Sequence, residues 1–429
     1  MITLSNCGRL SDNEAIEEAI RRRESDGIVV IGERIAEEEP ERRYWLLDRA
    51  ILLPENTTII LRNCKIKLSD KCRDNFFRTA NCGMGIEFPE PISNVHIKGE
   101  GFSLLEGADH PRAVGDASKT LTRPCPYTVE DLCKYAPWIP EERRKSGELI
   151  FEERHNHSYG TDADKAGESP MGDWRGIGIL FANAEHFSIS GIKIVDSHGW
   201  AISLEACSYG RVEKIEFDMR MSKMIDGMLH NMENQDGIDL RNGCHHVVVS
   251  DITGRTGDDV IALTAIAGDA YMAGGSTCNT HVMHNDWSKR DASIHDVIIR
   301  NVIAYSNLCY VVRLLSCNTE IYNVVVDGII DSTPEPTGHS ATMAIGSADG
   351  NYGKNLPDGM KHITISNVIC NGTKAGINIS GYLKDSTITN VVNKNPSVPL
   401  IRVVRENALG NVEMTNLSTK GEIIPKMSN

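Results

Sequence analysis

A short phrase of alternating apolar and polar residues recurs through most of the chain. It reads apolar-x-apolar-x, then Asn, Gly or Asp, then an apolar residue. Variants stand at 187–192, 247–252, 297–302, 324–329, 363–368 and 387–391. The alternation predicts short β-strands with one buried face, and the Asn, Gly or Asp predicts a turn through left-handed backbone space. We expect asparagines at equivalent turns to stack into hydrogen-bonded ladders.

A second apolar segment follows these phrases in each repeat. Examples are residues 201–204, 237–240, 260–263, 311–314, 343–346 and 376–379. Two strand phrases per repeat, without hairpin turn signals between them, predict an all-β chain that forms a parallel β-solenoid of stacked coils. A β-sandwich is the alternative built from many short strands, and it would show those hairpin signals.

An amphipathic segment precedes the repeats. Residues 12–24 place apolar side chains on one face and charged side chains on the other, which predicts a helix. Asp12 is the expected N-cap, and Glu14 falls in the first turn, where the helix dipole favours an acid. We expect this helix to cap the N-terminal end of the solenoid.

Two long stretches break the repeat. Residues 108–175 carry six prolines and a charged cluster, and residues 264–293 separate two strand phrases. Both are predicted to be insertions outside the coils, because solenoids accept long loops on one side. Residues 392–429 follow the last recognisable repeat and are expected to cover the C-terminal end. The whole chain, 1–429, is predicted to be one domain.

Acidic residues gather at the start of two successive second strands. Asp236 and Asp258 are separated by 22 positions, about one coil, so the two acidic clusters are expected to lie side by side. Asp259 then shares a column with Asp236. A fold does not need three like charges close together, whereas glycoside hydrolysis needs carboxylates in opposite protonation states. These three residues are the candidate catalytic group.

Alignment of the second strands adds polar residues to the same face. Asp239 and Arg313 fall in one column, and Arg241 falls in the column two residues further on. A charge within the otherwise apolar strand around Arg313 requires a reason. We expect Asp239, Arg241 and Arg313 to line the groove beside the aspartates and to contact the substrate.

At these residues the chain resembles the polygalacturonases of glycoside hydrolase family 28. The family motifs are Asn-x-Asp, then Asp-Asp about one coil later, then Gly-His-Gly and Arg-x-Lys. Asn234 and Asp236 match the first, Asp258 and Asp259 the second, and Arg313 the arginine of the last. The resemblance implies a right-handed parallel β-helix (the pectin-lyase fold) with Asn234 in its substrate groove. It also implies an inverting hydrolase in which Asp258 protonates the leaving oxygen, while Asp236 and Asp259 activate water.

Two departures from the family bear on the substrate. No Gly-His-Gly occurs, and Leu315 stands where the family has lysine, although Arg241 lies in the same column two coils earlier. Since that lysine and the arginine help to hold the sugar carboxylate in the family, a uronate here would rest on Arg313 and Arg241. The expected substrate is an oligosaccharide, and the two insertions favour exo action.

Residues before the neighbouring strand are also candidates. His198 and Trp200 precede the second strand of the coil before Asp236, so we expect them to border the groove and bind substrate, the indole by stacking on a sugar face. His281 and His284 have helix-like spacing, but no carboxylate pairs with them in the sequence. Neither a metal site nor a cofactor is therefore expected.

Composition narrows the partners. The 429 residues carry a formal charge of −14 with a pI near 5.5, which disfavours nucleic acid and anionic membranes. No apolar run approaches the roughly 18 residues of a membrane helix, and no signal peptide is visible. The 12 cysteines lack CxxC pairs, which is typical of free thiols in a reducing compartment, so a cytoplasmic location is expected. A homo-oligomer is compatible with the fold, but no interface is readable.

Two other functions fit the same pattern. A β-helix polysaccharide lyase would need a basic residue as proton acceptor, for which Arg313 is a candidate, and commonly calcium. A non-catalytic carbohydrate-binding β-helix would need only the groove.

Overall fold

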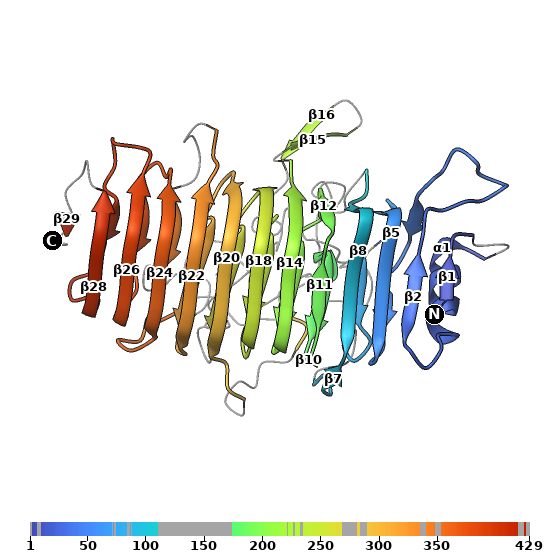
Figure 1. The fold of residues 1–429 in the computed structure, drawn as a ribbon, viewed down its shortest axis with the longest axis horizontal. Coiled ribbons are helices and arrows are strands. Elements are labelled where there is room, and N and C mark those ends of the chain that lie inside the picture. Colours follow the sequence, from blue (N-terminus) through green and yellow to red (C-terminus); the bar gives the residue numbers. More distant parts are fainter. Residues whose placement is uncertain are drawn as a thin grey trace, which may run out of the picture.

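The computed structural model describes residues 2–6, 10–70, 72, 74–83, 86, 88–109, 174–220, 222–225, 228–231, 235–267, 281–283, 290–334, 340–347, 353–418 and 424–425. These residues form a right-handed parallel β-helix, as the repeat and the family resemblance predict (Figure 1). The N-terminus and the C-terminus lie at opposite ends of the stack of coils.

Sixteen strands form the larger sheet, and most of its long members contain two residues with positive φ, one near the start and one near the middle of the strand. They are β1 (Ile2–Leu4), β2 (Ile28–Ile31), β3 (Trp45–Leu47), β5 (Thr57–Leu68), β7 (Ile92–Ser93), β8 (Val95–Glu106), β10 (Ala184–Glu185), β11 (Ser188–Ser190), β12 (Lys193–Val195), β14 (Ser208–Asp218), β18 (His245–Thr256), β20 (Ile294–Ser306), β22 (Ile321–Asp331), β24 (Met360–Cys370), β26 (Leu383–Asn393) and β28 (Leu409–Ser418).

Eleven shorter strands form the second sheet, which holds the predicted site. They are β4 (Ile51–Leu53), β6 (Phe77–Thr79), β9 (Ile179–Ala182), β13 (Ile202–Glu205), β17 (Ile238–Arg241), β19 (Ile261–Ile266), β21 (Val312–Cys317), β23 (Ala341–Ile345), β25 (Ala375–Ile379), β27 (Ile401–Val403) and β29 (Ile424–Pro425). Both sheets pair in parallel throughout, which excludes the sandwich. Within the described residues, the antiparallel pairing is confined to β15 (Ser222–Ile225) and β16 (Met228–Asn231), which project from the coils in Figure 1.

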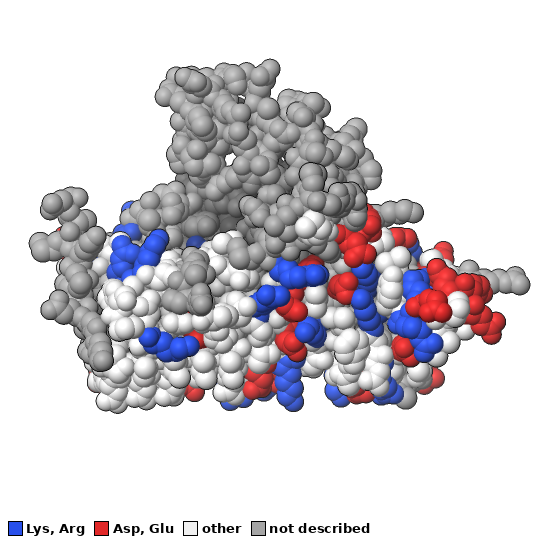
Figure 2. Space-filling view, turned by 90° about the horizontal axis from the view of Figure 1, so that it is seen from above, with Lys and Arg blue, Asp and Glu red and all other residues white. Residues whose placement is uncertain are grey.

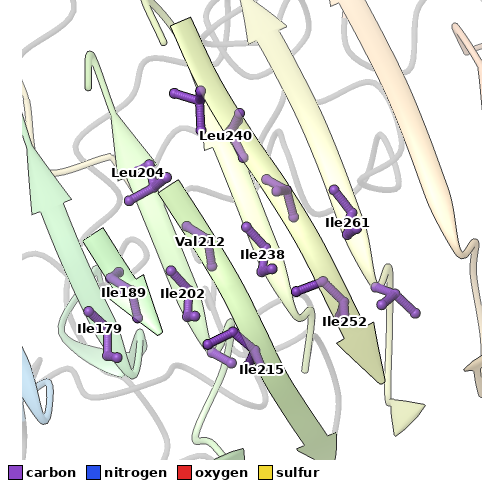
Figure 3. Packing of buried hydrophobic residues seen from close by; sticks show 14 of the residues in the cluster. Ile179, Ile189, Ile202, Leu204, Val212, Ile215, Ile238, Leu240, Ile252 and Ile261 are labelled. Atoms are coloured by element: carbon purple, nitrogen blue, oxygen red, sulfur yellow. The ribbon is translucent and has the colours of Figure 1, made fainter. Parts of the chain in front are cut away.

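The coils stack because each strand position pairs with the equivalent position of the next coil. In the second sheet Ile202 pairs with Ile238, and Ile238 with Ile261, so branched side chains form continuous buried rows. Figure 3 shows these rows facing Val212 and Ile252 of the larger sheet. β-branched residues suit this packing because their side chains fill the pleated surface with few rotamers to lose.

The predicted turn ladders are present. At the mid-strand bends of the larger sheet, the Asn390 side-chain amide donates to Asn367 at 3.1 Å, and Asn416 donates to Asn390 at 3.0 Å. At the other corner Asn94 donates to Asn56 at 2.9 Å. All five have positive φ, a conformation that Asn tolerates better than most residues.

The N-terminal helix covers the first coils, but its cap differs from the prediction. Helix α1 (Asp12–Arg21) begins after Ser11, whose side chain accepts from the Glu14 N–H while the Glu14 carboxylate accepts from the Ser11 N–H. This is a capping box, so Ser11 and not Asp12 is the N-cap. The helix ends at Arg21 with Arg22 as its C-cap, three residues before the predicted end at residue 24.

The buried Asp12 carboxylate instead ties the helix to the first coils. It pairs with the Arg34 Nε at 2.9 Å and with Arg42, and it accepts from the Leu46 N–H at 2.7 Å. Figure 2 shows acidic and basic side chains intermingled around this end of the molecule.

The short 3-10 helix Trp174–Gly176 leads into β9.

Two predicted boundaries are wrong. Residues 264–266 continue strand β19, so the insertion does not begin at 264. Residues 392–418 do not form a covering tail, because β27 and β28 add a further coil whose alternation is too polar to stand out in the sequence. Most of 108–175 and of 264–293 lies outside the described residues. No described helix is long and apolar enough to cross a membrane.

The Asp12 cluster yields a stability prediction. Replacing Asp12 with Asn leaves the buried Arg34 and the partly buried Arg42 with less compensating charge and should cost roughly 3 kcal/mol of unfolding free energy. The control Glu33→Gln breaks an exposed pair with Arg43 and should cost under about 1 kcal/mol. Equal losses in chemical denaturation would contradict a supporting role for Asp12.

Candidate active site

The candidate active site lies along the starts and outward faces of four second-sheet strands. The register places Ser203, Asp239, Ala262 and Arg313 in one column, as predicted. The next outward column holds Glu205, Arg241, Thr264 and Leu315. Each strand therefore contributes to the same surface, and backbone pairing fixes the spacing between neighbouring coils.

Asp259 is the anchored member of the cluster. Its carboxylate accepts from the Tyr310 N–H at 2.9 Å and pairs with the Arg313 Nη1 at 3.3 Å. The pKa of Asp259 is raised to about 7, and burial is the largest cause of the rise. The charge of Asp258 raises this pKa further, whereas Arg313 lowers it. At neutral pH this carboxyl therefore titrates, although its ordinary pKa lies near 4.

Asp236 and Asp239 are buried with less compensation. Burial raises the pKa of each well above its usual range, and the other aspartates of the cluster raise it further. Asp236 Oδ1 and Asp239 Oδ2 have no hydrogen-bond partner within the part of the chain that the structure describes. Such groups hold a proton more readily than a surface carboxylate does, so the cluster shares protons at neutral pH.

Asp258 is the more accessible carboxylate. Its side chain is half-buried, and its Oδ1 accepts from the Asp259 N–H at 2.9 Å. Cys309, on the next coil, lies beside it: Asp258, Asp259 and Cys309 each offer a donor atom within 4.8 Å of the others. Burial raises the pKa of the Cys309 thiol, and the nearby carboxylates raise it further, so it is a neutral neighbour of the acids. This set could hold a cation, although Arg313 already compensates Asp259.

Two glycines let the coils approach closely here. A Cβ on Gly237 would lie 2.4 Å from the Val260 carbonyl oxygen, and one on Gly257 would lie 3.0 Å from the Gln235 side chain. The Gln235 side-chain amide donates to the Ser197 carbonyl at 2.9 Å, and the Gln235 backbone carbonyl accepts from the Asp258 N–H at 3.2 Å. A larger residue in place of Gly257, the glycine before the two aspartates, would therefore require Gln235 to shift.

Arg241 is fully buried, which excludes an ordinary surface arginine. Its guanidinium stacks over the Trp200 indole at 4.6 Å from the ring centroid. Electrostatically it acts on Asp239 and on Glu205. Trp200 is half-buried, so one face of its ring is committed to this stack and only the remaining surface is open to a ligand.

Glu205 and His281 form a buried pair that the sequence did not reveal. The His281 Nδ1 lies 2.9 Å from Glu205, which also accepts from the N–H groups of Val282 and Met283. Burial favours a raised pKa for Glu205, but His281 and Arg241 outweigh it and the net shift is downward. Burial, reinforced by Arg241, lowers the pKa of His281 to about 4. The pair thus fixes residues 281–283 against the site.

His198 was predicted to border the groove, but in the structure its side chain makes a buried structural contact. It is buried, and its Nε2 accepts from the Ala108 N–H at 2.9 Å. This joins the entrance of β13 to the end of β8. Asn234 and His284 lie outside the described residues, so their predicted positions are not tested here.

The structure adds site residues that motif reasoning missed. In the coil after Asp258 and Asp259, Tyr310 occupies the column of Asp236 and Asp259, and Cys309 occupies the position equivalent to Asp258. Their position before the strand 311–314 was the available signal, but neither residue type belongs to the family motifs. Glu205 lay in the column of Arg241 and was hidden because it closes an otherwise apolar strand.

No protein-family model matches the sequence, and no curated protein sequence matches it significantly. Solved structures are similar. A polygalacturonase from Erwinia carotovora ssp. carotovora has a TM-score of 0.56 at 13% identity, covering 99% of this chain and 96% of that chain. An exopolygalacturonase from Thermotoga maritima has 0.50 at 15%, covering 97% and 93%. The surface protein and adhesin PfbA of Streptococcus pneumoniae has 0.52 at 12%, covering 97% and 96%. The chain therefore has the polygalacturonase-like β-helix fold, which these enzymes share with an adhesin.

Proposed function

We propose that the protein is a glycoside hydrolase that cleaves an oligosaccharide with the carboxylates of Asp236, Asp258 and Asp259. The buried acidic cluster carries this proposal. Folding gains nothing from Asp236, Asp239 and Asp259, whose pKa values are raised by burial and by neighbouring carboxylates, whereas acid–base catalysis requires a retained proton beside an ionised base. The polygalacturonase likeness, which gives the fold, is compatible with this reaction.

The roles follow from the environments. Asp258 is the accessible carboxyl and is proposed to protonate the leaving glycosidic oxygen. Asp259, held by Arg313 and the Tyr310 N–H, is oriented to accept a proton from water, and Asp236 adjoins it in the same column. Water would then attack the face of the sugar opposite the leaving group, the inverting outcome.

Arg313 is the proposed substrate contact as well as the partner of Asp259. Its side chain is 16% exposed, so it can reach a ligand while it holds the carboxylate. Arg241 is buried under Trp200 and is better placed to support Asp239 than to meet a sugar. If the sugar is a uronate, Arg313 is the residue proposed to carry its recognition.

An adhesin with the same fold makes a binding protein the second candidate. A panel of neutral and uronate oligosaccharides, with products followed by NMR, separates the functions. An inverted anomer supports the hydrolase, an unsaturated product absorbing in the ultraviolet supports a lyase, and saturable binding without turnover supports the binding protein.

The acid assignment predicts that Asp258→Asn keeps the fold and lowers kcat by about two to four orders of magnitude. The loss should be smaller on aryl glycosides, whose leaving groups need less protonation. Asp251→Asn is the matched control, because this exposed turn aspartate can be replaced by the residue that neighbouring coils use. Near-full activity of Asp258→Asn on a natural glycoside would remove Asp258 from the acid role.

The Arg313 contact predicts a shifted pH profile. Arg313 lowers the pKa of Asp259, so Arg313→Gln should raise that pKa further above 7. Because Asp259 must be ionised to accept a proton, the acidic limb of kcat against pH should move to higher pH. Arg313→Lys should restore part of the shift, and Arg300→Gln, on the exposed face of β20, should leave the limb in place. An unmoved limb in Arg313→Gln would contradict the proposed base.

The raised pKa of Asp239 also makes stability depend on pH. The folded state holds this proton more tightly than the unfolded chain, so the unfolding free energy should fall as pH rises from about 4 through neutrality. Asp239→Asn should flatten that slope and raise Tm at pH 8, since each unit of pKa difference is worth about 1.4 kcal/mol. Thermal unfolding across pH, with Asp251→Asn as control, tests this; an unchanged slope would refute it.

A further inference from the structure

A second cluster of ionisable side chains lies on the larger sheet, at the corner where its long strands begin. The turn position there is Asn56 and Asn94 in early coils and Asn323, His362, Asp385 and Asn411 in late ones, all with positive φ. The register places His186, Tyr209, His246 and Asp296 at this position in the four coils between them. These coils thus replace the amide ladder with imidazoles, a phenol and a carboxylate.

The ring nitrogens of this cluster converge. The Nδ1 atoms of His245 and His246 lie 2.9 Å apart, so one of them can donate a hydrogen bond to the other only if the acceptor nitrogen is unprotonated. The Nδ1 of His295 lies 2.7 Å from Asp296 Oδ2, and the Nδ1 of His246 lies 3.7 Å from the same oxygen. Donor atoms of His246, His295 and Asp296 all fall within 4.8 Å of one another.

Packing alone does not account for that convergence. The imidazole of His295 stacks face to face with His245 at 5.0 Å and with Tyr322 at 4.7 Å, so ring faces supply the contact between coils. Stacking fixes the plane of each ring but not which of its two edges carries Nδ1, because a half-turn about the Cβ–Cγ bond keeps the plane. The Nδ1 atoms of His246 and His295 nevertheless both lie near the same oxygen of Asp296.

We propose that His246, His295 and Asp296 bind a divalent transition-metal ion such as Zn²⁺. Zinc bonds of about 2.0–2.2 Å in a tetrahedral site place neighbouring donors roughly 3.3 Å apart. Two of the three donor separations are 2.7 and 3.7 Å and the third lies within 4.8 Å, so side-chain rotations would bring the donors to bonding distance of one ion. Imidazole nitrogens select Zn²⁺, Ni²⁺ or Cu²⁺ over Ca²⁺ and Mg²⁺, which prefer all-oxygen ligands.

Charge and access both suit a cation. The carboxylates of Glu185 and Asp291 interact electrostatically with His245, so negative charge surrounds the imidazoles. The side chains of His246 and Asp296 are 45% and 36% exposed, which leaves an entry from solvent. The ligands come from β18 and β20, so the ion would cross-link two successive coils. This site lies on a different sheet from the proposed active site and does not depend on it.

Titration of tag-free protein with zinc chloride by calorimetry tests the proposal. Wild type should bind one ion saturably and gain in Tm, and His246→Asn and His295→Gln should each weaken binding at least tenfold. Asn suits the positive φ of His246, since it fills this turn in other coils. The control His362→Asn makes the same replacement at the same turn position two coils after Asp296 and should bind as wild type.

Cys309→Ser separates the alternative location. This variant should retain the zinc site, because Cys309 adjoins only the Asp258 cluster. Binding lost in Cys309→Ser and kept in His246→Asn would move the ion to the active site and overturn the proposal. Absence of saturable binding to wild type, with the fold verified by circular dichroism, would also overturn it.

Discussion

The parallel backbone ladder between successive coils is the constraint on which the structure depends. Each coil satisfies its main-chain hydrogen bonds mainly on the two coils beside it, so a position in one coil is bound to the same position in the next. Side chains therefore accumulate in columns. Isoleucines that share an inward column form the core, asparagines that share a corner form ladders, and acids that share a strand start form a site. One rule of registry places residues that are far apart in the sequence.

The same registry forces a conflict at the site. Asp236, Asp239 and Asp259 are brought together by strands that cannot slip apart without losing their ladders, and burial removes the water that would separate their charges. Arg313 relieves part of this repulsion by pairing with Asp259, and Arg241 acts on Asp239 from its stack on Trp200. The remaining unfavourable electrostatic free energy is offset by the stability of the rest of the solenoid.

Registry also explains how far the sequence could lead. The columns of Asp239 with Arg313 and of Arg241 with Leu315 follow from strand phrases alone, because a period of two fixes the face of every side chain. The N-cap at Ser11 was misplaced by one residue, since Ser11 and Asp12 are both good caps and only the side-chain geometry separates them. The coil of β27 and β28 was missed because its outward residues are polar enough to blur the alternation. The pairing of Glu205 with His281 joins residues whose separation an insertion sets, and no period reaches across an insertion.

A stack of coils in which neighbours touch mainly neighbours behaves as a one-dimensional array. Its weakest units are the outermost ones, and α1 protects the N-terminal end with a buried salt-bridge cluster. Strands β23, β25, β27 and β29 separate the site from the C-terminal end. Fraying that begins at that end can therefore melt coil by coil while the four aspartates keep their geometry, so loss of the proposed activity on heating should lag behind loss of secondary structure.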